Sequence, residues 1–91
     1  MGLKSTTTCL GYQQITSLTS STALTVPAGA TLALIVPETQ SVRWRDDGIA
    51  PTASVGMLVP AKSSMSYDGD LKAIRFIAAT SGAILNVSYY A

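Results

Sequence analysis

Turn-forming residues interrupt this chain at short intervals, and their spacing limits its possible folds more than any other feature. Short runs of Thr, Val, Ile, Leu and Tyr alternate with Gly, Pro, Asp and Ser, and no stretch keeps a 3.6-residue apolar period for three turns. Turn signals every 8–12 residues or so are typical of β-sandwiches and small barrels. The sequence therefore predicts an all-β fold, either a single small antiparallel β-sandwich or a jelly-roll-like barrel, with about 7–8 short strands.

The turns themselves have recognisable chemistry. "VPAGA" places Pro27 before Gly29 between two apolar runs, and "DDG", "YDGD" and "TSGA" each end a run with residues that favour tight turns. The expected strands occupy residues 12–18, 23–26, 31–36, 41–45, 57–59, 64–67, 71–77 and 83–90.

The chain is long enough for one domain. Its 91 residues fit a single core, and no internal repeat or second domain is visible. Residues 1–11 are rich in Ser and Thr, so they are expected to form an N-terminal arm that is either flexible or adds a strand to a neighbouring subunit. Residues 12–91 are expected to form the β-sandwich domain.

The composition indicates assembly with other protein subunits. Apolar residues make up 47% of the chain and charged residues only 12%, against a usual charged fraction of about 25%. A small monomer normally keeps itself in solution with charged side chains. The shortage therefore predicts that part of the surface faces other protein chains.

Several partners and compartments are not expected. A net charge of +1 is too small to favour nucleic acid. The longest apolar run, residues 32–36, is far shorter than the ~20 residues of a membrane helix. No apolar segment follows Lys4, so no signal peptide is expected and synthesis in a cytoplasm is predicted. The single cysteine, Cys9, rules out an internal disulfide.

The segment "VRWRDDG" is the most distinctive in the chain. In a strand, Val42 and Trp44 share one face, expected to be the core side, while Arg43 and Arg45 share the other. The expected site is a structural clamp that positions the loop 47–51, in which arginines pair with Asp46 or Asp47. The alternative is that the arginines face a ligand or partner. The clamp and its turn comprise Arg43, Trp44, Arg45, Asp46, Asp47, Gly48 and Arg75.

An enzyme is not expected. The chain has no histidine, so it cannot build a Ser-His-Asp or Cys-His arrangement, and zinc sites lose their commonest ligand. Cys9 has no base beside it in sequence. Asp68 and Asp70 flank a glycine, which fits a turn better than a calcium site because the other loop ligands are missing. No catalytic residue, cofactor or metal is therefore predicted.

The tyrosines allow a second interpretation. Tyr89 and Tyr90 are consecutive and would face opposite sides of the last strand. Together with Tyr12 and Tyr67 they could form a platform for stacking sugars. The other interpretation is that they are core and rim tyrosines, whose hydroxyls reach the surface.

Four segments, in order, resemble a known class of proteins. "VPAGA", "RWRDDGIAPTASVG", "LKAIRFI" and "LNVSYY" follow one another within residues 12–91, and this pattern resembles small β-sandwich structural proteins of tailed-bacteriophage virions. The resemblance implies that "RWRDDGIAPTASVG" is chiefly a structural signature.

The resemblance also implies a function. It indicates a non-enzymatic virion component, assembled in the host cytoplasm and most simply a decoration or cement protein on the capsid. We expect symmetric homo-oligomers, with trimers suggested by the three-fold axes of capsids and fibres, bound to the major capsid protein or another virion protein. The alternative is a receptor- or carbohydrate-binding module of a phage fibre or tail, which would use the tyrosines, Trp44 and the arginines.

Overall fold

The computed structural model describes residues 8–91, and this part of the chain contains eight strands and no helix. Each strand is followed by a turn or loop, as the sequence predicts. The strands are β1 (Cys9–Ile15), β2 (Thr22–Ala23), β3 (Leu32–Glu38), β4 (Val42–Arg45), β5 (Met57–Val59), β6 (Met65–Tyr67), β7 (Arg75–Ala78) and β8 (Ile84–Tyr90).

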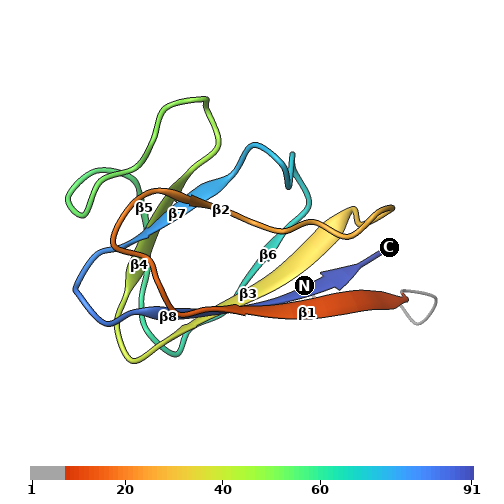
Figure 1. Cartoon of the computed structure of the whole chain (residues 1–91), viewed down its shortest axis with the longest axis horizontal. Coiled ribbons are helices and arrows are strands. Elements are labelled where there is room, and N and C mark those ends of the chain that lie inside the picture. Colours follow the sequence, from red (N-terminus) through yellow and green to blue (C-terminus); the bar gives the residue numbers. More distant parts are fainter. Residues whose placement is uncertain (1–7) are drawn as a thin grey trace.

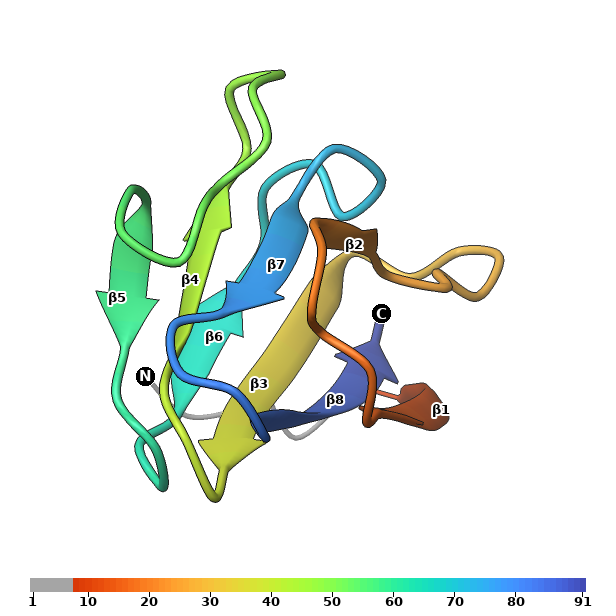
Figure 2. The ribbon, with the colours of Figure 1, turned by 60° about the vertical axis from the view of Figure 1, so that its left-hand side comes forward.

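The strands form two four-stranded antiparallel sheets. One sheet has the order β1-β8-β3-β6 and the other β2-β7-β4-β5. Successive strands mostly alternate between the sheets, and this order is that of an eight-stranded jelly roll. The predicted all-β sandwich is confirmed. In Figure 2, β5 lies at one margin of the molecule and β1 at the other, so both are edge strands.

The core fills the space between the sheets. On β8 the side chains of Leu85, Val87 and Tyr89 are buried, while those between them are only partly covered. The same alternation on β3 buries Ala33 and Ile35. This period of two is what a strand with one inward face requires, and each large buried side chain contributes roughly 1.5–3 kcal/mol.

The first strand begins earlier than predicted. Cys9 already pairs with Tyr90 of β8, so residues 9–11, placed in the N-terminal arm by the sequence, belong to the sandwich. A register shift between Cys9 and Gly11 marks a bulge that lets this pairing continue. Thr8 exchanges backbone hydrogen bonds with Ala91 at 2.9 and 3.0 Å, and residues 1–7 of the predicted arm lie outside the described residues.

Two other predicted strands are shorter in the structure. After β2, the backbone N–H of Thr25 donates to Oε1 of Gln13 at 3.1 Å, so the chain leaves its sheet and turns toward β1. Before β7, Oδ1 of Asp70 accepts the N–H of Lys72 at 3.1 Å and starts a turn. Such local acceptors compete with strand pairing. Leu71 and Ile74 are therefore buried from a turn, not from the predicted strand over 71–77.

The loop between β4 and β5 stands out from one end of the sandwich (Figure 1). It begins with the "DDG" segment, and Gly48 has a φ of 84°. Left-handed backbone of this kind costs a glycine little, and it allows the chain to reverse there. The residues of the predicted clamp lie at the base of this loop.

Candidate functional site

Trp44 lies at the margin of the core. Its strand position matches the prediction, because Val42 on the same face is fully buried and Trp44 pairs with the buried Phe76 of β7. Trp44 itself is only partly buried, since the neighbouring β5 is the last strand of the sheet. Trp44 thus faces the core side, as expected, and its ring is partly buried against the core cluster. The indole also packs edge to face on Tyr67 of the opposite sheet.

Tyr67 joins the two sheets through a second contact. Its hydroxyl donates a 2.6 Å hydrogen bond to Oδ2 of Asp46, just beyond β4. Desolvation and this hydrogen bond raise the pKa of Tyr67 to about 12. A Cβ on Gly69 would collide with the Tyr67 hydroxyl, so glycine in "YDGD" leaves room for this ring. Asp46 is thus fixed by a tyrosine and not by an arginine.

Arg45 and Asp47 form the ion pair of the site. Nε of Arg45 donates to Oδ1 of Asp47 at 3.0 Å, and Nη2 donates to Oδ2 at 2.5 Å. These hydrogen bonds lower the pKa of Asp47 and raise that of Arg45. Both side chains reach solvent, at 26% and 50% exposure, so salt screens the pair and its contribution to stability is small. The pair mainly sets the shape of the turn.

Arg43 fixes the other arm of the loop. Its Nε donates to the carbonyl of Ala53 at 3.1 Å, and its Nη1 donates to the carbonyl of Gly56 at 3.0 Å. A guanidinium can donate hydrogen bonds to neutral carbonyl oxygens as well as to carboxylates. The predicted pairing of Arg43 with an aspartate is therefore wrong. Arg43 does hold the loop, as predicted, but through the backbone carbonyls of Ala53 and Gly56.

Arg75 does not join the clamp either. Its Nη1 donates to the carbonyls of Lys72 and Ile74, at 2.7 and 3.1 Å. Within residues 8–91 the Arg45–Asp47 pair is the one salt bridge. Of the predicted clamp, the structure brings Arg45, Asp47 and Gly48 together as an ion-paired turn and gives Arg43, Asp46 and Arg75 other partners.

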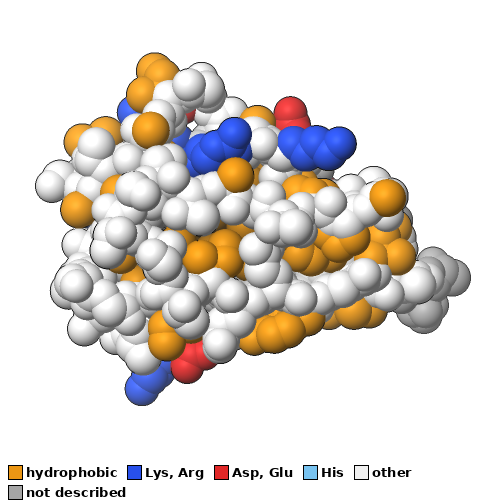
Figure 3. Space-filling view, in the orientation of Figure 1, with side chains coloured by type: hydrophobic (Ala, Val, Ile, Leu, Met, Phe, Trp, Pro, Cys, Tyr) orange, Lys and Arg blue, Asp and Glu red, His pale blue; other side chains and the backbone are white. Residues whose placement is uncertain are grey.

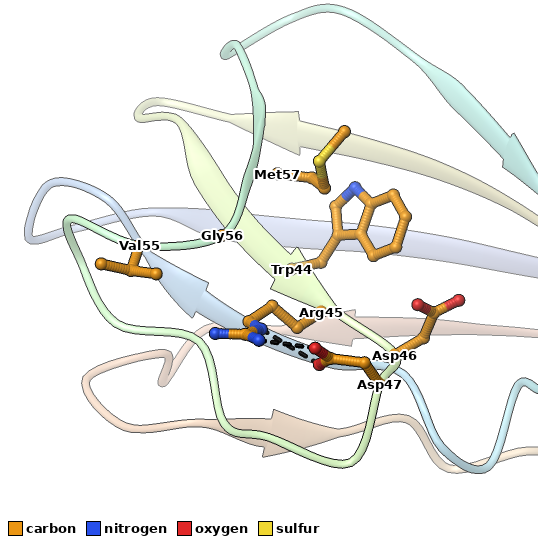
Figure 4. A pocket seen from close by; sticks show the side chains of 7 residues that line it. All are labelled: Trp44, Arg45, Asp46, Asp47, Val55, Gly56 and Met57. Carbon is orange, nitrogen blue, oxygen red and sulfur yellow. Dashed lines mark hydrogen bonds and ion pairs between the residues drawn. The ribbon is translucent and has the colours of Figure 1, made fainter.

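A depression of about 360 Å³ lies against these residues, between the end of β4 and the strand β5. Figure 4 shows Trp44 and Met57 on one side of the β4 ribbon and the Arg45–Asp47 pair on the other. Its lining residues are Trp44, Arg45, Asp46, Asp47, Val55, Gly56 and Met57. Its walls combine apolar side chains with a charged rim, in which Arg45 pairs with Asp47 and Asp46 accepts from the Tyr67 hydroxyl.

Four large apolar side chains are exposed in the segment from the β4–β5 loop through β5, and two of them, Val55 and Met57, line the depression. Their exposed fractions are 58% for Ile49, 53% for Val55, 60% for Met57 and 51% for Leu58. We call these four residues the β5 edge patch; hydrophobic side chains are visible over this end of the molecule in Figure 3. The sequence interpretation missed this patch. The sequence feature that could have revealed it is the stretch 48–61, "GIAPTASVGMLVPA", which contains no charged residue.

The four tyrosines do not form one platform. Tyr89 is 1% exposed and donates to Oε1 of Gln13 at 2.6 Å, and burial raises its pKa to about 12. Tyr67 packs on Trp44 at the opposite margin. Tyr12 and Tyr90 alone point outward from the sheet β1-β8-β3-β6, where Tyr12 is 63% exposed. The interpretation of the tyrosines as core and rim residues therefore fits better than a four-tyrosine platform, although Tyr12 and Tyr90 share one face.

Of the remaining acidic residues, Glu38 ends β3, while Asp68 and Asp70 lie between β6 and β7. Asp70 accepts the backbone N–H of Lys72, as described above. Among residues 8–91, no group of three His, Cys, Asp or Glu side chains is close enough to hold a metal ion. In the same part of the chain, no helix is long and apolar enough to cross a membrane.

The geometry thus presents an apolar edge beside the Arg45–Asp47 ion pair, at the end of a jelly roll. Comparison with known proteins adds no relative to this picture: no family model, no curated protein and no solved structure matches the chain.

Proposed function

We propose that this chain is a non-enzymatic structural subunit of a tailed-bacteriophage virion, serving as a capsid decoration or cement protein. It assembles as a symmetric homo-oligomer, a trimer in the simplest case, and binds the major capsid protein or another virion protein. Assembly takes place in the host cytoplasm, and the mature location is the particle.

The β5 edge patch is the observation that carries this proposal. Its members, Ile49, Val55, Met57 and Leu58, each expose more than half of their surface. Val55 and Met57 share the lining of one depression, and monomeric proteins rarely expose contiguous apolar surface, because water makes that surface costly. A subunit in a shell covers the patch with a neighbouring chain. The 12% charged fraction of the whole chain and the resemblance of its turn and strand segments to virion proteins support the same conclusion.

The fold agrees with this proposal but does not decide it. Jelly rolls build viral capsid proteins, lectins and cupins alike, so function must come from the surface. The rim of the depression supports a structural use. Arg45 and Asp47 neutralise each other, and Arg43 is occupied by two carbonyls. These groups shape the loop that carries Ile49 and Val55.

Quantitative mass spectrometry of purified virions tests the proposal. The chain should occur at a fixed ratio to the major capsid protein, as the symmetry of a shell requires. A few copies per particle would place it in the tail or fibre instead. Its absence from washed particles, when it is abundant in the infected cell, would overturn the proposal.

A receptor- or carbohydrate-binding module of a fibre or tail is the second candidate. The observation that favours it is the outward face near Tyr12, whose hydroxyl donates to Oδ1 of Asn86 at 2.5 Å. Gln14 donates to the same atom at 3.0 Å, and Asn86 donates to Oε1 of Glu38 at 2.7 Å. An exposed aromatic ring beside such a polar row suits a sugar. Glycan-array binding that Tyr12→Ala abolishes would favour this function over the first.

A further inference from the structure

Two arginines face each other across neighbouring strands. Arg45 on β4 and Arg75 on β7 are cross-strand partners, and the register places both on the outer face of their sheet. Like charges in this position repel each other. Arg45 is compensated by Asp47. Arg75 has no carboxylate within 4.0 Å among residues 8–91, so its charge is left uncompensated.

The guanidinium of Arg75 is nevertheless held in place. Its Nη1 donates to the carbonyls of Lys72 and Ile74, which fixes one end of the group. Its Nε and Nη2 donate to no group in the described part of the chain. Arg45 uses this same pair of atoms, Nε and Nη2, to grip both oxygens of Asp47. Arg75 therefore presents a fixed, unused fork of the kind that recognises a carboxylate.

A small pocket lies against this arginine. Its volume is about 180 Å³, and it is lined by Ser21, Gly48, Ile49, Ala50, Ala73 and Arg75. These residues come from the segment before β2, the loop after β4 and the start of β7. None of them is acidic. Ser21 adds a hydroxyl to this lining, which can donate to or accept from a ligand.

The lining selects the chemistry of the ligand. Two alanines and Ile49 offer apolar walls, while Arg75 offers one positive charge and two donors side by side. A single guanidinium balances a single negative charge, so a carboxylate on a short hydrocarbon stem fits better than a dianionic phosphate. Basic side chains are also visible along the upper margin of the molecule in Figure 3, near the start of β7.

We propose that the Arg75 pocket is a carboxylate-binding site that receives an acidic side chain of a neighbouring protein subunit. This rests on the proposed function, which supplies the neighbour. Ile49 lines the pocket and is itself 58% exposed, so a neighbour that covers Ile49 can insert its carboxylate beside it. Neutralising Arg75 in this way also removes its repulsion with Arg45.

The site can be tested on the isolated full-length chain with sodium acetate as the probe. In NMR spectra, acetate should shift the Arg75 Nε–H signal and the backbone amides of Gly48, Ile49 and Ala50 in a saturable way. Sodium chloride at the same ionic strength should not. Equal responses to both salts, or a response that does not saturate, would overturn the site.

Three variants distinguish the effect of the paired N–H donors of Arg75 from the effect of its positive charge. Arg75→Gln should weaken acetate binding by about tenfold or more. Arg75→Lys keeps the charge but loses the paired donors, and should show an intermediate loss. The matched control is Lys72→Gln, which removes one nearby positive charge outside the pocket and leaves the backbone carbonyl that accepts from Arg75. It should change binding by less than about twofold. An equal loss in Lys72→Gln and Arg75→Gln would reduce the effect to general electrostatics and overturn the site.

The Arg75 side chain also donates to the backbone carbonyls of Lys72 and Ile74, so each variant must be checked for folding. Circular dichroism and amide spectra of each variant establish that it is folded. If Arg75→Gln does not fold, the saturable response of the unmodified chain and the intermediate response of Arg75→Lys still decide the matter.

Incorporation into particles identifies the source of the carboxylate. If the acid comes from a neighbouring subunit, Arg75→Gln should be depleted from purified virions relative to Lys72→Gln. Normal incorporation of an Arg75→Gln chain that no longer binds acetate would overturn the neighbour and leave a site for free carboxylates. If the unmodified chain binds acetate but never enters particles, the proposed function fails while the pocket stands.

Discussion

The indole of Trp44 on β4 meets the phenol ring of Tyr67 on β6 edge to face, with ring centroids 5.7 Å apart and planes inclined at 63°. The two rings come from opposite sheets and close the sandwich at its β5 margin. Edge-to-face contacts of this kind add to the stabilisation from buried area. They also bring Asp46 and the start of the β4–β5 loop to the second sheet, through the Tyr67 hydroxyl.

Replacing Trp44 with alanine should lower the free energy of unfolding by about 2–4 kcal/mol. The lower part of this range reflects a ring that is only partly buried. Chemical denaturation measures the change, and Trp44→Phe, which keeps an aromatic ring against Tyr67, should lose less than half as much. A loss below about 1 kcal/mol for the alanine variant would show that the ring does not support the sandwich.

Replacing Tyr67 with phenylalanine should cost about 0.5–1.5 kcal/mol, because Asp46 loses its hydrogen bond while the ring contact with Trp44 stays. Asp46→Asn retains an acceptor and serves as the control, with a smaller loss. Equal stability of the unmodified chain and Tyr67→Phe would mean that the hydroxyl contributes nothing.

Stability should fall in strong alkali. The pKa values of Tyr67 and Tyr89 are both raised from 10.0 to about 12, so folding favours their neutral forms. This contribution is complete below the unfolded pKa of 10.0 and is lost as the pH rises through about 12. Denaturation midpoints between these two pH values measure the slope. Tyr89→Phe should make it shallower; an unchanged slope would show that Tyr89 titrates alike in both states.

The Arg45–Asp47 pair should make the stability of the fold depend on pH in acid. Hydrogen bonds from Arg45 lower the pKa of Asp47 below 3.8 in the folded chain, so its contribution is present above that pH and is lost as the pH falls through the folded value. In Arg45→Gln, an NMR titration of the Asp47 carboxyl should give a higher pKa, and added salt should shrink the difference. Lys62→Gln, which removes a charge elsewhere, should leave it unchanged. A pKa of Asp47 that ignores Arg45 would contradict the pairing.

The β5 edge patch should hold copies of the chain together. Leu58→Asp places a charge in the patch at a residue that is 51% exposed, so it should dissociate the oligomer without unfolding the chain. Tyr12→Asp introduces the same charge at the opposite edge strand and serves as the control. Light scattering measures the mass. An unmodified chain that runs at the 9.4 kDa of one copy would contradict self-association.

The sequence by itself determined the features that depend on local geometry. In residues 85–89 apolar and polar residues alternate, which specifies the side chains that enter the core, because successive strand residues point to opposite faces. Residues 32–36 are all apolar, so only the structure shows that Ala33 and Ile35 are the buried ones. The turn at the Asp-Gly pair was predictable because glycine readily adopts the left-handed backbone that Gly48 has in the structure. The Arg45–Asp47 pair was within reach of the same reasoning, since its members lie two residues apart.

Tertiary structure decided the contacts between distant segments. Asp46 meets Tyr67 across 21 positions, and Arg43 meets the carbonyl of Gly56 across 13. Arg45 faces Arg75 because β4 pairs with β7, and Trp44 is only partly buried because β5 ends the sheet. Alternation fixes the side of a strand on which a residue lies, but strand order and register fix its neighbours, and these depend on how the two sheets pack as a whole. The unpaired fork of Arg75 and the exposed β5 edge patch therefore became visible only when the strands were placed side by side.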